Sequence, residues 1–428
     1  MTSSKLNVAV AQFGGPTAVI NRSLVGAVLE LKRKNAAILG PRFGIKGLIN
    51  NDFYRLDLYS DSKLEYIGKS PGSYLGTSKF KVNEESAPSI ASKLKELDIR
   101  YFFMIGGDST ASIAKKILDA AQKINFEIIV FHIPKTIDND LVENDHTPGF
   151  GSAARLIAKA AYGIDQENRS SGGIYGMVVM GRDSGFLAYS SALLRTSDGG
   201  PDLIYGPEIS FSIDYFLNDL KDVYSRKNRV FFVLSEGIRT YFFENNQLVY
   251  ENNKPKEELI VEKAARELKK EIEVEEILGI TSLSASTDVL ISYINQILTK
   301  EFKNIRIRMN NLGYLARSFP EISEIDAIEA KEIGRKAVEY AFKFGSGTVL
   351  IKRIGQTHNY SVKFEYSELE KIVNATKQVP REWIGHYGKD IGLEFLTYAG
   401  PLIGYIPGFE YLDHLLPANF DYKKIIKK

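Results

Sequence analysis

The amino-acid sequence predicts an α/β fold with mainly parallel sheets. Three apolar runs in the first third of the chain are expected to form buried strands that end in glycine or in polar residues: 7–13, 101–105 and 126–131. A second series of such strands is expected at 174–180, 230–234 and 304–312. Strands that alternate with helical patterns are typical of doubly wound parallel sheets. Because 428 residues are too many for one small domain, we expect two Rossmann-like domains.

Composition and charge narrow the class of protein. Hydrophobic residues make up 44% of the chain, and 55 basic residues balance 53 acidic ones to a net charge of +2, so nucleic acid is not suggested as a partner. The absence of cysteine excludes disulfides and thiolate chemistry. The first residues lack a charged-then-apolar leader, and no apolar run approaches the roughly 20 residues of a membrane span. We therefore expect a cytoplasmic protein without a membrane partner.

The first expected strand leads through Gly14, Gly15 and Pro16 into a helical pattern at 19–29. Such a turn is able to cradle phosphate, because it exposes backbone N–H groups beside the positive end of a helix. Two glycines alone do not distinguish this cradle from a plain β–α turn.

The second expected strand ends in a similar unit, 106–110, which opens a helix at 111–123. Its carboxylate, Asp108, is suited to hold Mg²⁺ beside a bound phosphate. Earlier in the chain, a piece rich in glycine, serine and tyrosine covers 68–78 and precedes Lys79. Small residues followed by a cation are able to wrap around a bound anion, although such a piece is more often a surface loop.

The third expected strand is followed by Lys135, Thr136, Asp138 and Asp140. The two aspartates point the same way if the chain is extended, so they are able to share a metal, a proton or a sugar hydroxyl. Polar clusters at the carboxyl ends of parallel strands are how open α/β sheets form sites. Asp-Asn-Asp is also ordinary turn chemistry, and this segment alone leaves the two interpretations near even.

The later strand ends add Arg182, Glu236 and Arg317. Glycines, cations and carboxylates at strand ends are what phosphoryl transfer requires around a polyphosphate, a metal and an attacking hydroxyl. The chain has no Walker A motif, no H-E-x-x-H and no G-x-S-x-G. A G-x-G-x-x-A match at 149–154 has no strand before it, which disfavours a dinucleotide site.

Five ordered motifs resemble those of the phosphofructokinase family. They are Gly106-Gly107-Asp108, Pro134 to Asp140, Met180-Gly181-Arg182, Ser235-Glu236-Gly237 and Leu312 to Arg317. Segments 14–21 and 145–152 are similar to the pyrophosphate-dependent branch of the family. The resemblance extends from about 8 to 353, with fainter similarity to 407.

The resemblance implies the phosphofructokinase fold, with the active site in the interdomain cleft. A phosphoryl-donor domain is expected at 1–150 plus about 318–366. A sugar-phosphate domain and C-terminal tail are expected at 151–317 plus 367–428. The family also implies a homodimer or homotetramer.

Catalytic roles are implied for residues of the motifs. Asp138 is the general base that takes the proton from the 1-hydroxyl of fructose 6-phosphate, and Asp140 supports it. Thr136 and Arg182 stabilise the transferring group, and Lys135 belongs to the same catalytic set. A carboxylate base is physically reasonable, because the hydroxyl needs little help once the donor is well neutralised.

The residues that hold the substrates are implied in the same way. Asp108 binds Mg²⁺, the implied cofactor, at the donor. The donor, pyrophosphate or ATP, contacts Gly14, Gly15, Lys79, Gly107, Ser109 and Thr110. The sugar is held by Thr136, Asp138, Asp140, Met180, Gly181, Arg182 and Glu236, and its 6-phosphate by Arg308, Tyr314 and Arg317.

The donor is predicted from Lys135 and Ser109. In this family, lysine at the first position is typical of pyrophosphate enzymes and glycine of short ATP enzymes, although some longer ATP enzymes keep the lysine. The second position is aspartate in typical pyrophosphate users and glycine in ATP users, so Ser109 matches neither. We predict a diphosphate–fructose-6-phosphate 1-phosphotransferase of glycolysis or gluconeogenesis, with an ATP-dependent 6-phosphofructokinase as the alternative.

Two departures from the family pattern concern the acceptor. Lys79 stands where an arginine usually bridges donor and sugar phosphates, and lysine lacks the bidentate fork. Gly173 stands where many relatives carry an arginine that reaches a neighbouring subunit's sugar phosphate. These departures leave open another phosphosugar, such as sedoheptulose 7-phosphate. A catalytically silent sugar-phosphate-binding regulator is disfavoured, because Asp108, Asp138 and Arg182 are all present.

Overall fold

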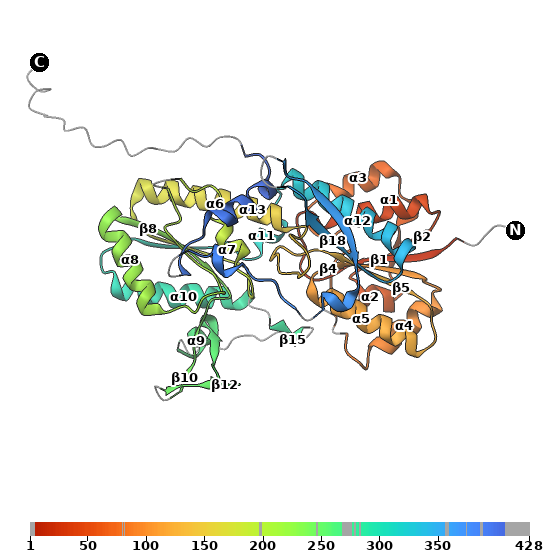
Figure 1. Cartoon of the computed structure of the whole chain (residues 1–428), viewed down its shortest axis with the longest axis horizontal. Coiled ribbons are helices and arrows are strands. Elements are labelled where there is room, and N and C mark those ends of the chain that lie inside the picture. The colour runs from red at the N-terminus through yellow and green to blue at the C-terminus, as the bar shows by residue number, and fades with distance from the viewer. Residues whose placement is uncertain are drawn as a thin grey trace, which may run out of the picture.

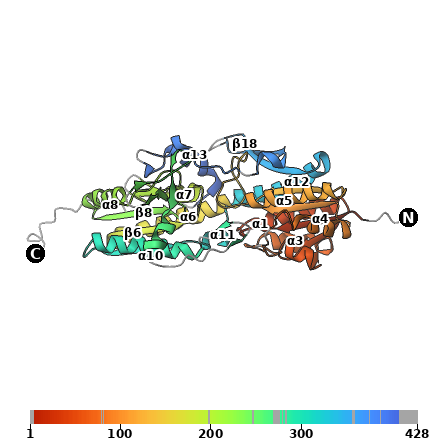
Figure 2. The ribbon, with the colours of Figure 1, turned by 90° about the horizontal axis from the view of Figure 1, so that it is seen from below.

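The computed structural model describes residues 5–78, 80, 82–196, 199–244, 247–267, 276–277, 280–281, 284–355, 359–373, 375–385 and 388–406. Figure 1 shows two α/β lobes side by side, each built on its own sheet. Turned by 90°, the molecule is elongated, with α3 (Asp61–Gly68) towards one end and α8 (Ile213–Lys227) towards the other (Figure 2).

The larger lobe contains a seven-stranded sheet in the order β19-β18-β5-β4-β1-β2-β3. The strands are β1 Asn7–Gln12, β2 Ala37–Pro41, β3 Phe53–Arg55, β4 Tyr101–Gly106, β5 Ile129–Pro134, β18 Gly347–Arg353 and β19 Val362–Ser367. The five central strands run parallel, and β3 and β19 pair antiparallel at the edges. The central strands are almost wholly buried, as expected for a sheet covered on both faces.

Helices cover both faces of this sheet. One face is covered by α1 Ile20–Arg33, α3 and α12 Glu324–Phe344, and the other by α2 Ile45–Ile49, α4 Ala87–Glu96 and α5 Asp108–Lys123. A Cβ on Gly26 of α1 would lie 2.0 Å from the carbonyl oxygen of Lys331, and one on Gly334 of α12 would lie 2.1 Å from that of Ser23. These two glycines allow the close crossing that returns the late helix α12 to the first lobe.

The smaller lobe contains four parallel strands in the order β17-β6-β8-β7. They are β6 Gly173–Val179, β7 Leu203–Tyr205, β8 Arg229–Ser235 and β17 Ile307–Asn311. One face packs on α6 Phe150–Ser171, α7 Phe186–Ser190 and α13 Leu393–Ala399, and the other on α8, α9 Ile260–Glu267 and α10 Ser284–Glu301. A short helix, α11 Leu315–Ser318, follows β17.

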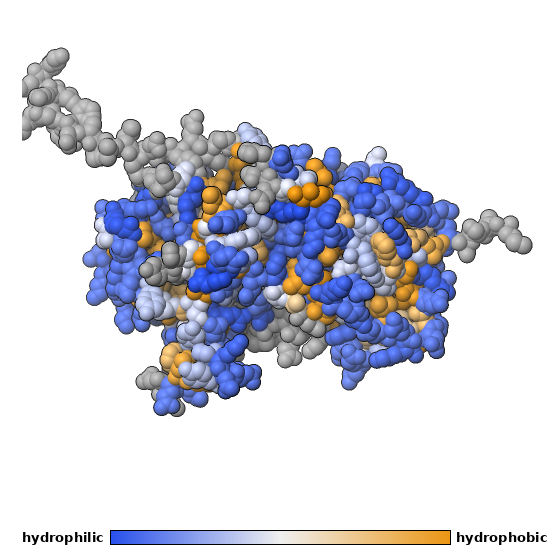
Figure 3. Space-filling model, viewed as in Figure 1, coloured by the Kyte–Doolittle hydropathy of each residue, from blue (hydrophilic) through white to orange (hydrophobic). Residues whose placement is uncertain are grey.

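A projection of short strands extends from the smaller lobe (Figure 1). The strands are β9 Arg239–Tyr241, β10 Phe243–Glu244, β11 Gln247–Leu248, β12 Tyr250–Glu251, β13 Lys254–Pro255 and β14 Glu257–Leu259, and β15 Glu276–Ile277 and β16 Ile280–Thr281 form a further pair. Figure 3 shows apolar side chains on this projection, whereas hydrophilic residues dominate the visible face of the molecule. Phe243 and Tyr250 are exposed there.

The predicted fold class is confirmed, because both sheets are mainly parallel and covered by helices. The expected strands and helices are present with shifted ends, while the strand β2 and the edge strands β3, β7 and β19 were not expected. β18 and β19 join the first sheet although they follow the whole second sheet along the chain. The domain boundaries themselves stay a prediction. Within the described ranges, no helix has both the length and the apolar character of a membrane span.

Candidate active site

The strands β1, β4 and β5 are parallel neighbours, so their carboxyl ends lie at one edge of the larger sheet. The loop after β5 brings Lys135 to the glycines after β1. The Lys135 Nζ donates to the Gly15 carbonyl oxygen at 2.6 Å, and the side chain is only 3% exposed. Gly14 has a positive φ of 66°, which favours glycine. The predicted proximity of the glycine turn and the lysine is therefore observed.

Arg317 reaches the same place from the smaller lobe. A Cβ on Gly15 would lie 2.8 Å from the guanidinium carbon of Arg317, so the side chain lies directly against the glycine turn. Its guanidinium also stacks over the ring of Tyr314, 4.4 Å from the ring centre. The side chain thus lies beside the glycines expected to bind the donor, and the predicted role of Arg317 in holding the sugar 6-phosphate stays a prediction.

Asp138 and Asp140 each have an oxygen, Oδ1, that is buried and finds no hydrogen-bond partner among the described residues. Burial raises the pKa of Asp138 to about 6, although the positive charge of Arg317 opposes this rise. Burial and the charge of Asp138 raise the pKa of Asp140 to about 7. A carboxylate whose pKa lies near 7, and which has a buried oxygen without a partner, is suited to accept a proton.

The basic side chains near these carboxylates have shifted pKa values as well. Burial and the charge of Arg317 together lower the pKa of Lys135 to about 7, while Asp138 and Asp140 oppose the shift. The neighbouring His132 is fully buried within β5, and burial lowers its pKa to about 4, so it is neutral near pH 7. His132 is therefore a core histidine.

The backbone of the loop after β5 is held by the segment before α6. Thr136 pairs with Gly149 in an isolated parallel bridge, and the Thr147 hydroxyl donates to the Thr136 carbonyl oxygen at 3.1 Å. The Asp138 amide donates to the Thr136 hydroxyl at 3.1 Å. Thr136 is thus a structural partner of Asp138 in this structure, in addition to its implied role on the transferring group.

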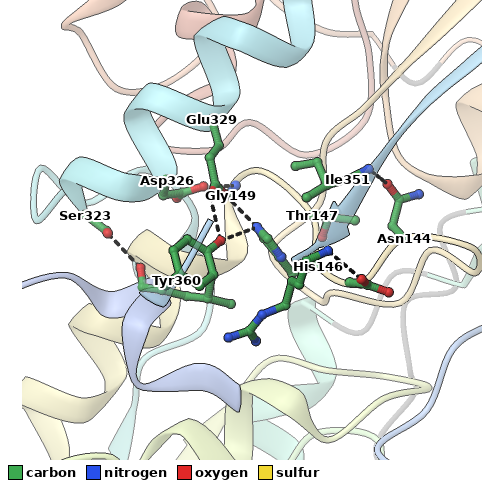
Figure 4. A network of polar contacts seen from close by, with 12 residues as sticks. Asn144, His146, Thr147, Gly149, Ser323, Asp326, Glu329, Ile351 and Tyr360 are labelled. Carbon is green, nitrogen blue, oxygen red and sulfur yellow. Dashed lines mark hydrogen bonds and ion pairs between the residues drawn. The ribbon is translucent and has the colours of Figure 1, made fainter. Parts of the chain in front are cut away.

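A polar network anchors that segment to α12 (Figure 4). The Gly149 amide donates to Asp326 Oδ1 at 2.8 Å, and His146 Nε2 lies 2.6 Å from Glu329 Oε2. The Tyr360 hydroxyl donates to the other oxygen of Glu329 at 2.6 Å. The loop near the carboxylates is therefore fixed by a helix that returns from much later in the chain.

The unit after β4 lies beside the same loop. The Lys135 amide donates to the Gly106 carbonyl oxygen at 2.9 Å, and a Cβ on Gly107 would lie 3.8 Å from that of Thr136. Asp108 begins α5, followed by half-buried Ser109 and buried Thr110, whose side chain packs on Gly106. This strand end therefore lies against the backbone of the loop that carries Lys135 and Thr136.

These residues fit Mg²⁺ that is held largely by substrate. Among the described residues, no group of three or more histidine or acidic side chains forms a ready cage for a metal. Mg²⁺ is usually bound through one or two carboxylates together with phosphate oxygens. Asp108, at the start of α5 directly after the β4 strand end, is the single carboxylate that this pattern asks for.

The ends of β6 and β8 bring Met180, Gly181, Arg182 and Glu236 together. A Cβ on Gly237 would lie 1.9 Å from the Arg182 carbonyl oxygen, so the two loops are in close contact. Burial raises the pKa of Glu236, while Arg317 and the hydroxyl of Thr287 favour its charged form. Glu236 therefore lies near Arg317, between the smaller sheet and the residues of the larger one.

Of the other predicted residues, Tyr314 joins this group through its contact with Arg317. Arg308 is exposed on β17, and Tyr314 is 48% exposed. Lys79 lies outside the described residues. Gly173 has a φ of 97°, and a Cβ there would lie 2.4 Å from the Arg306 carbonyl oxygen, so this position does not admit an arginine without a backbone change. The predicted roles of Arg308 and Tyr314 in holding a phosphate stay predictions.

Sequence reasoning missed Tyr398, Asp326 and Glu329. The Asn139 amide group donates to the Tyr398 hydroxyl at 2.7 Å, although 259 positions separate them along the chain. No local pattern points to such partners, because the sequence around a buried tyrosine or glutamate of a late helix looks the same whether or not the residue contacts the site. Covariation with the Asp138 loop is the signal that could have revealed them.

Comparison with known proteins identifies the family of the chain. The Phosphofructokinase family model matches residues 7–341. The chain is 38% identical to the pyrophosphate–fructose 6-phosphate 1-phosphotransferase of Rhodospirillum rubrum, over 94% of this chain and 95% of that protein. It is 28% identical to the sulfofructose kinase of Alkalicoccus urumqiensis, over 86% of this chain and 88% of that protein.

Among solved structures, the chain is similar to the pyrophosphate-dependent phosphofructokinase of Nitrosospira multiformis. The TM-score is 0.75 at 26% identity, and the match covers 96% of this chain and 94% of that one. Fold, ordered motifs and sequence identity over nearly the whole length all agree, and the predicted family is confirmed: this chain belongs to the phosphofructokinase family.

Proposed function

We propose that this chain transfers a phosphoryl group from pyrophosphate to the 1-hydroxyl of fructose 6-phosphate. The observation that carries the proposal is the meeting of Lys135 and Arg317 at Gly15, beside a carboxylate with a free buried oxygen. Cations at a glycine turn suit a compact polyphosphate, and the carboxylate suits an attacking hydroxyl. Similarity to named pyrophosphate enzymes over nearly the whole chain supports the same activity.

In the proposed step, Asp138 accepts the proton of the sugar 1-hydroxyl. The oxygen then forms a bond to one phosphorus of pyrophosphate, and the bridging P–O bond breaks with its electron pair on the departing orthophosphate. Lys135, Arg317 and Arg182 hold charge that develops on the transferring group, and Thr136 orients the loop of the base. Mg²⁺ bound through Asp108 would neutralise the charge of the donor.

The choice of donor rests on Lys135. Its ammonium is directed at the glycine turn by the hydrogen bond to Gly15, so it contributes charge where a diphosphate would lie. Ser109, at the start of α5, lacks the negative charge that an aspartate would have, and unlike glycine it has a side chain. ATP is therefore the alternative donor that an assay must include.

The choice of acceptor is less constrained by the described residues. Gly173 leaves no room for an arginine at the start of β6, so a contact to a sugar phosphate from this position is lost. One relative is named for a different sugar acceptor, sulfofructose. Fructose 6-phosphate is the proposed acceptor, with sedoheptulose 7-phosphate as the next to test.

The test compares initial rates of the purified protein with Mg²⁺, using pyrophosphate or ATP as donor and each sugar phosphate as acceptor. We expect turnover with pyrophosphate and fructose 6-phosphate. Lys135→Met should lower kcat/KM for pyrophosphate about tenfold or more, because it removes a charged hydrogen-bonding group from the site. Lys123→Met, at the exposed far end of α5, is the control and should change nothing.

Each unexpected result corrects a different part of the proposal. Turnover with ATP alone would overturn the donor, and turnover with sedoheptulose 7-phosphate alone would overturn the acceptor. No turnover with any pair would contradict the enzyme assignment. We further propose that the protein acts in the cytoplasm, in glycolysis or gluconeogenesis, as a homodimer or homotetramer, which light scattering and fractionation would test.

A further inference from the structure

A late segment, 375–379, passes beside the loop that carries the two carboxylates. It follows β19 of the larger lobe and precedes α13, which packs on the smaller lobe (Figure 1). Thr376 pairs antiparallel with Leu141, and the Lys377 amide donates to the Asp140 carbonyl oxygen at 2.7 Å. The segment is therefore joined to the loop after β5 by a single antiparallel β-bridge and one further backbone hydrogen bond.

The ammonium group of Lys377 is directed at oxygen atoms of this loop. Its Nζ donates to the carbonyl oxygens of Asn144 at 2.9 Å and Asp145 at 3.2 Å, and to the side-chain oxygen of Asn139 at 3.4 Å. It also lies 5.1 Å from the centre of the Phe186 ring, on the other lobe. An ammonium has three N–H groups, and here all three have an acceptor on one loop.

Asn139, between the two carboxylates, needs such support. It has a positive φ of 58°, a conformation that costs a residue with a side chain about 1 kcal/mol and persists only when its surroundings fix it. Its side-chain nitrogen donates to the Tyr398 hydroxyl, and its side-chain oxygen accepts from the Thr147 amide at 3.0 Å. Lys377 contributes a third contact to the same side chain, from a different element.

Among the described residues, the two carboxylates are not held by side-chain contacts of this kind at their buried oxygens. The Oδ1 atoms of Asp138 and Asp140 are buried without a hydrogen-bond partner in the described part of the chain. Their direction therefore depends on the backbone of 138–140. That backbone is held at Asn139 and at the Asp140 carbonyl, which are the places where Lys377 makes contact.

The other end of the segment is attached to the smaller lobe. The side chain of Gln378 donates to the Asp183 carbonyl oxygen at 3.3 Å, and the Val379 amide donates to Glu208 Oε1 at 3.1 Å. The same Glu208 oxygen accepts from the Gly185 amide at 2.7 Å. The segment thus links the loop after β5 to the loop after β6, which carries the Arg182 motif.

We propose that Lys377 is a positioning residue of the phosphoryl-transfer site, which holds the Asp138–Asp140 loop in its active conformation and in register with the loop after β6. Burial lowers the pKa of Lys377 to about 7, while Asp140 and Asp145 stabilise its charged form. The ammonium therefore acts on the loop, through its contacts with Asn139, Asn144 and Asp145. The kinetic part of this inference rests on the proposed function.

The first test does not require turnover. Amide hydrogen exchange of the full-length protein would be compared between wild type, Lys377→Met and the control Lys371→Met, which removes an exposed lysine of the same late part of the chain. In Lys377→Met we expect exchange at 139–147 to be at least about tenfold faster, because the contacts that close the loop are lost. Exchange in β1 and α1 should not change, nor should any segment in the control.

The second test measures kcat and KM with the donor and acceptor that the wild type uses. We expect Lys377→Met to lower kcat at least about tenfold with little change in either KM, because the base is misplaced while the substrate contacts remain. Removal of the positive charge near Asp140 should also move the acid limb of the rate profile to higher pH. A residue with a purely structural role would lower the amount of folded enzyme without moving this limb.

The outcomes separate the two proposals. Unchanged exchange at 139–147, or a smaller loss of kcat, would overturn the role of Lys377. If the wild type turns over none of the substrate pairs, the proposed function fails, and the exchange experiment alone then decides on Lys377.

Discussion

Two buried carboxylates, those of Asp165 and Asp138, differ in whether their oxygens have charged partners. Asp165 on α6 is 1% exposed, and its oxygens meet Arg169 Nε at 2.7 Å and Arg229 Nη1 at 3.1 Å. Asp138 has a buried oxygen without any such partner among the described residues. An unsatisfied buried polar atom costs about 1–3 kcal/mol, so its presence indicates a place where a ligand supplies the missing partner.

The sharpest test of this comparison is Asp138→Asn. The substitution keeps the shape of the side chain and removes the base, so kcat should fall about a thousandfold. Stability should be unchanged or slightly higher, since a buried oxygen without a partner is no longer charged. Steady-state rates and a urea titration measure the two effects. Normal turnover by this variant would contradict the assigned base.

The matched change at the other carboxylate, Asp165→Asn, should have the opposite result. It leaves two buried guanidinium groups without their counter-charge, and we expect a loss of about 3 kcal/mol in the free energy of unfolding. The kcat of the molecules that remain folded should equal that of wild type. A large loss of kcat at full stability would show that Asp165 belongs to the site.

A smaller effect should appear in the pH dependence of stability. The pKa values of Asp138 and Asp140 are raised to about 6 and about 7, above the value of about 4 expected in the unfolded chain. The folded state then binds more protons between these values, so the two groups make unfolding easier as pH rises from about 4 to about 7. Activity should increase over the same range, because the base becomes ionised.

Urea titrations at several pH values would measure this trend. The double variant Asp138→Asn/Asp140→Asn should lose it, and Asp165→Asn should keep it. Lys135 and Lys377, whose pKa values are lowered to about 7, begin to lose protons only at the upper end of this window. If the free energy of unfolding declines with pH as steeply in the double variant as in wild type, groups other than Asp138 and Asp140 cause the decline.

The sequence predicted the parts of the site that lie at strand ends. Gly14, Lys135, Asp138 and Glu236 could be found because each follows an apolar run, and the ends of parallel strands meet at one sheet edge. The sheet order, the donor-side position of Arg317 and the support from α12 could not be found. They depend on packing between segments far apart in the chain, which leaves no local periodicity to detect.

The distance along the chain between Asn139 and Tyr398 also has a consequence for how the protein is made. These two residues are 259 positions apart, and the contact between them joins the loop that carries the base to the late part of the chain. A ribosome adds about 5–20 residues per second, so the base is synthesised tens of seconds before this support. All strands of both sheets, β18 and β19 included, precede Tyr398 along the chain, so the newborn molecule has its strands before it has a finished catalytic loop.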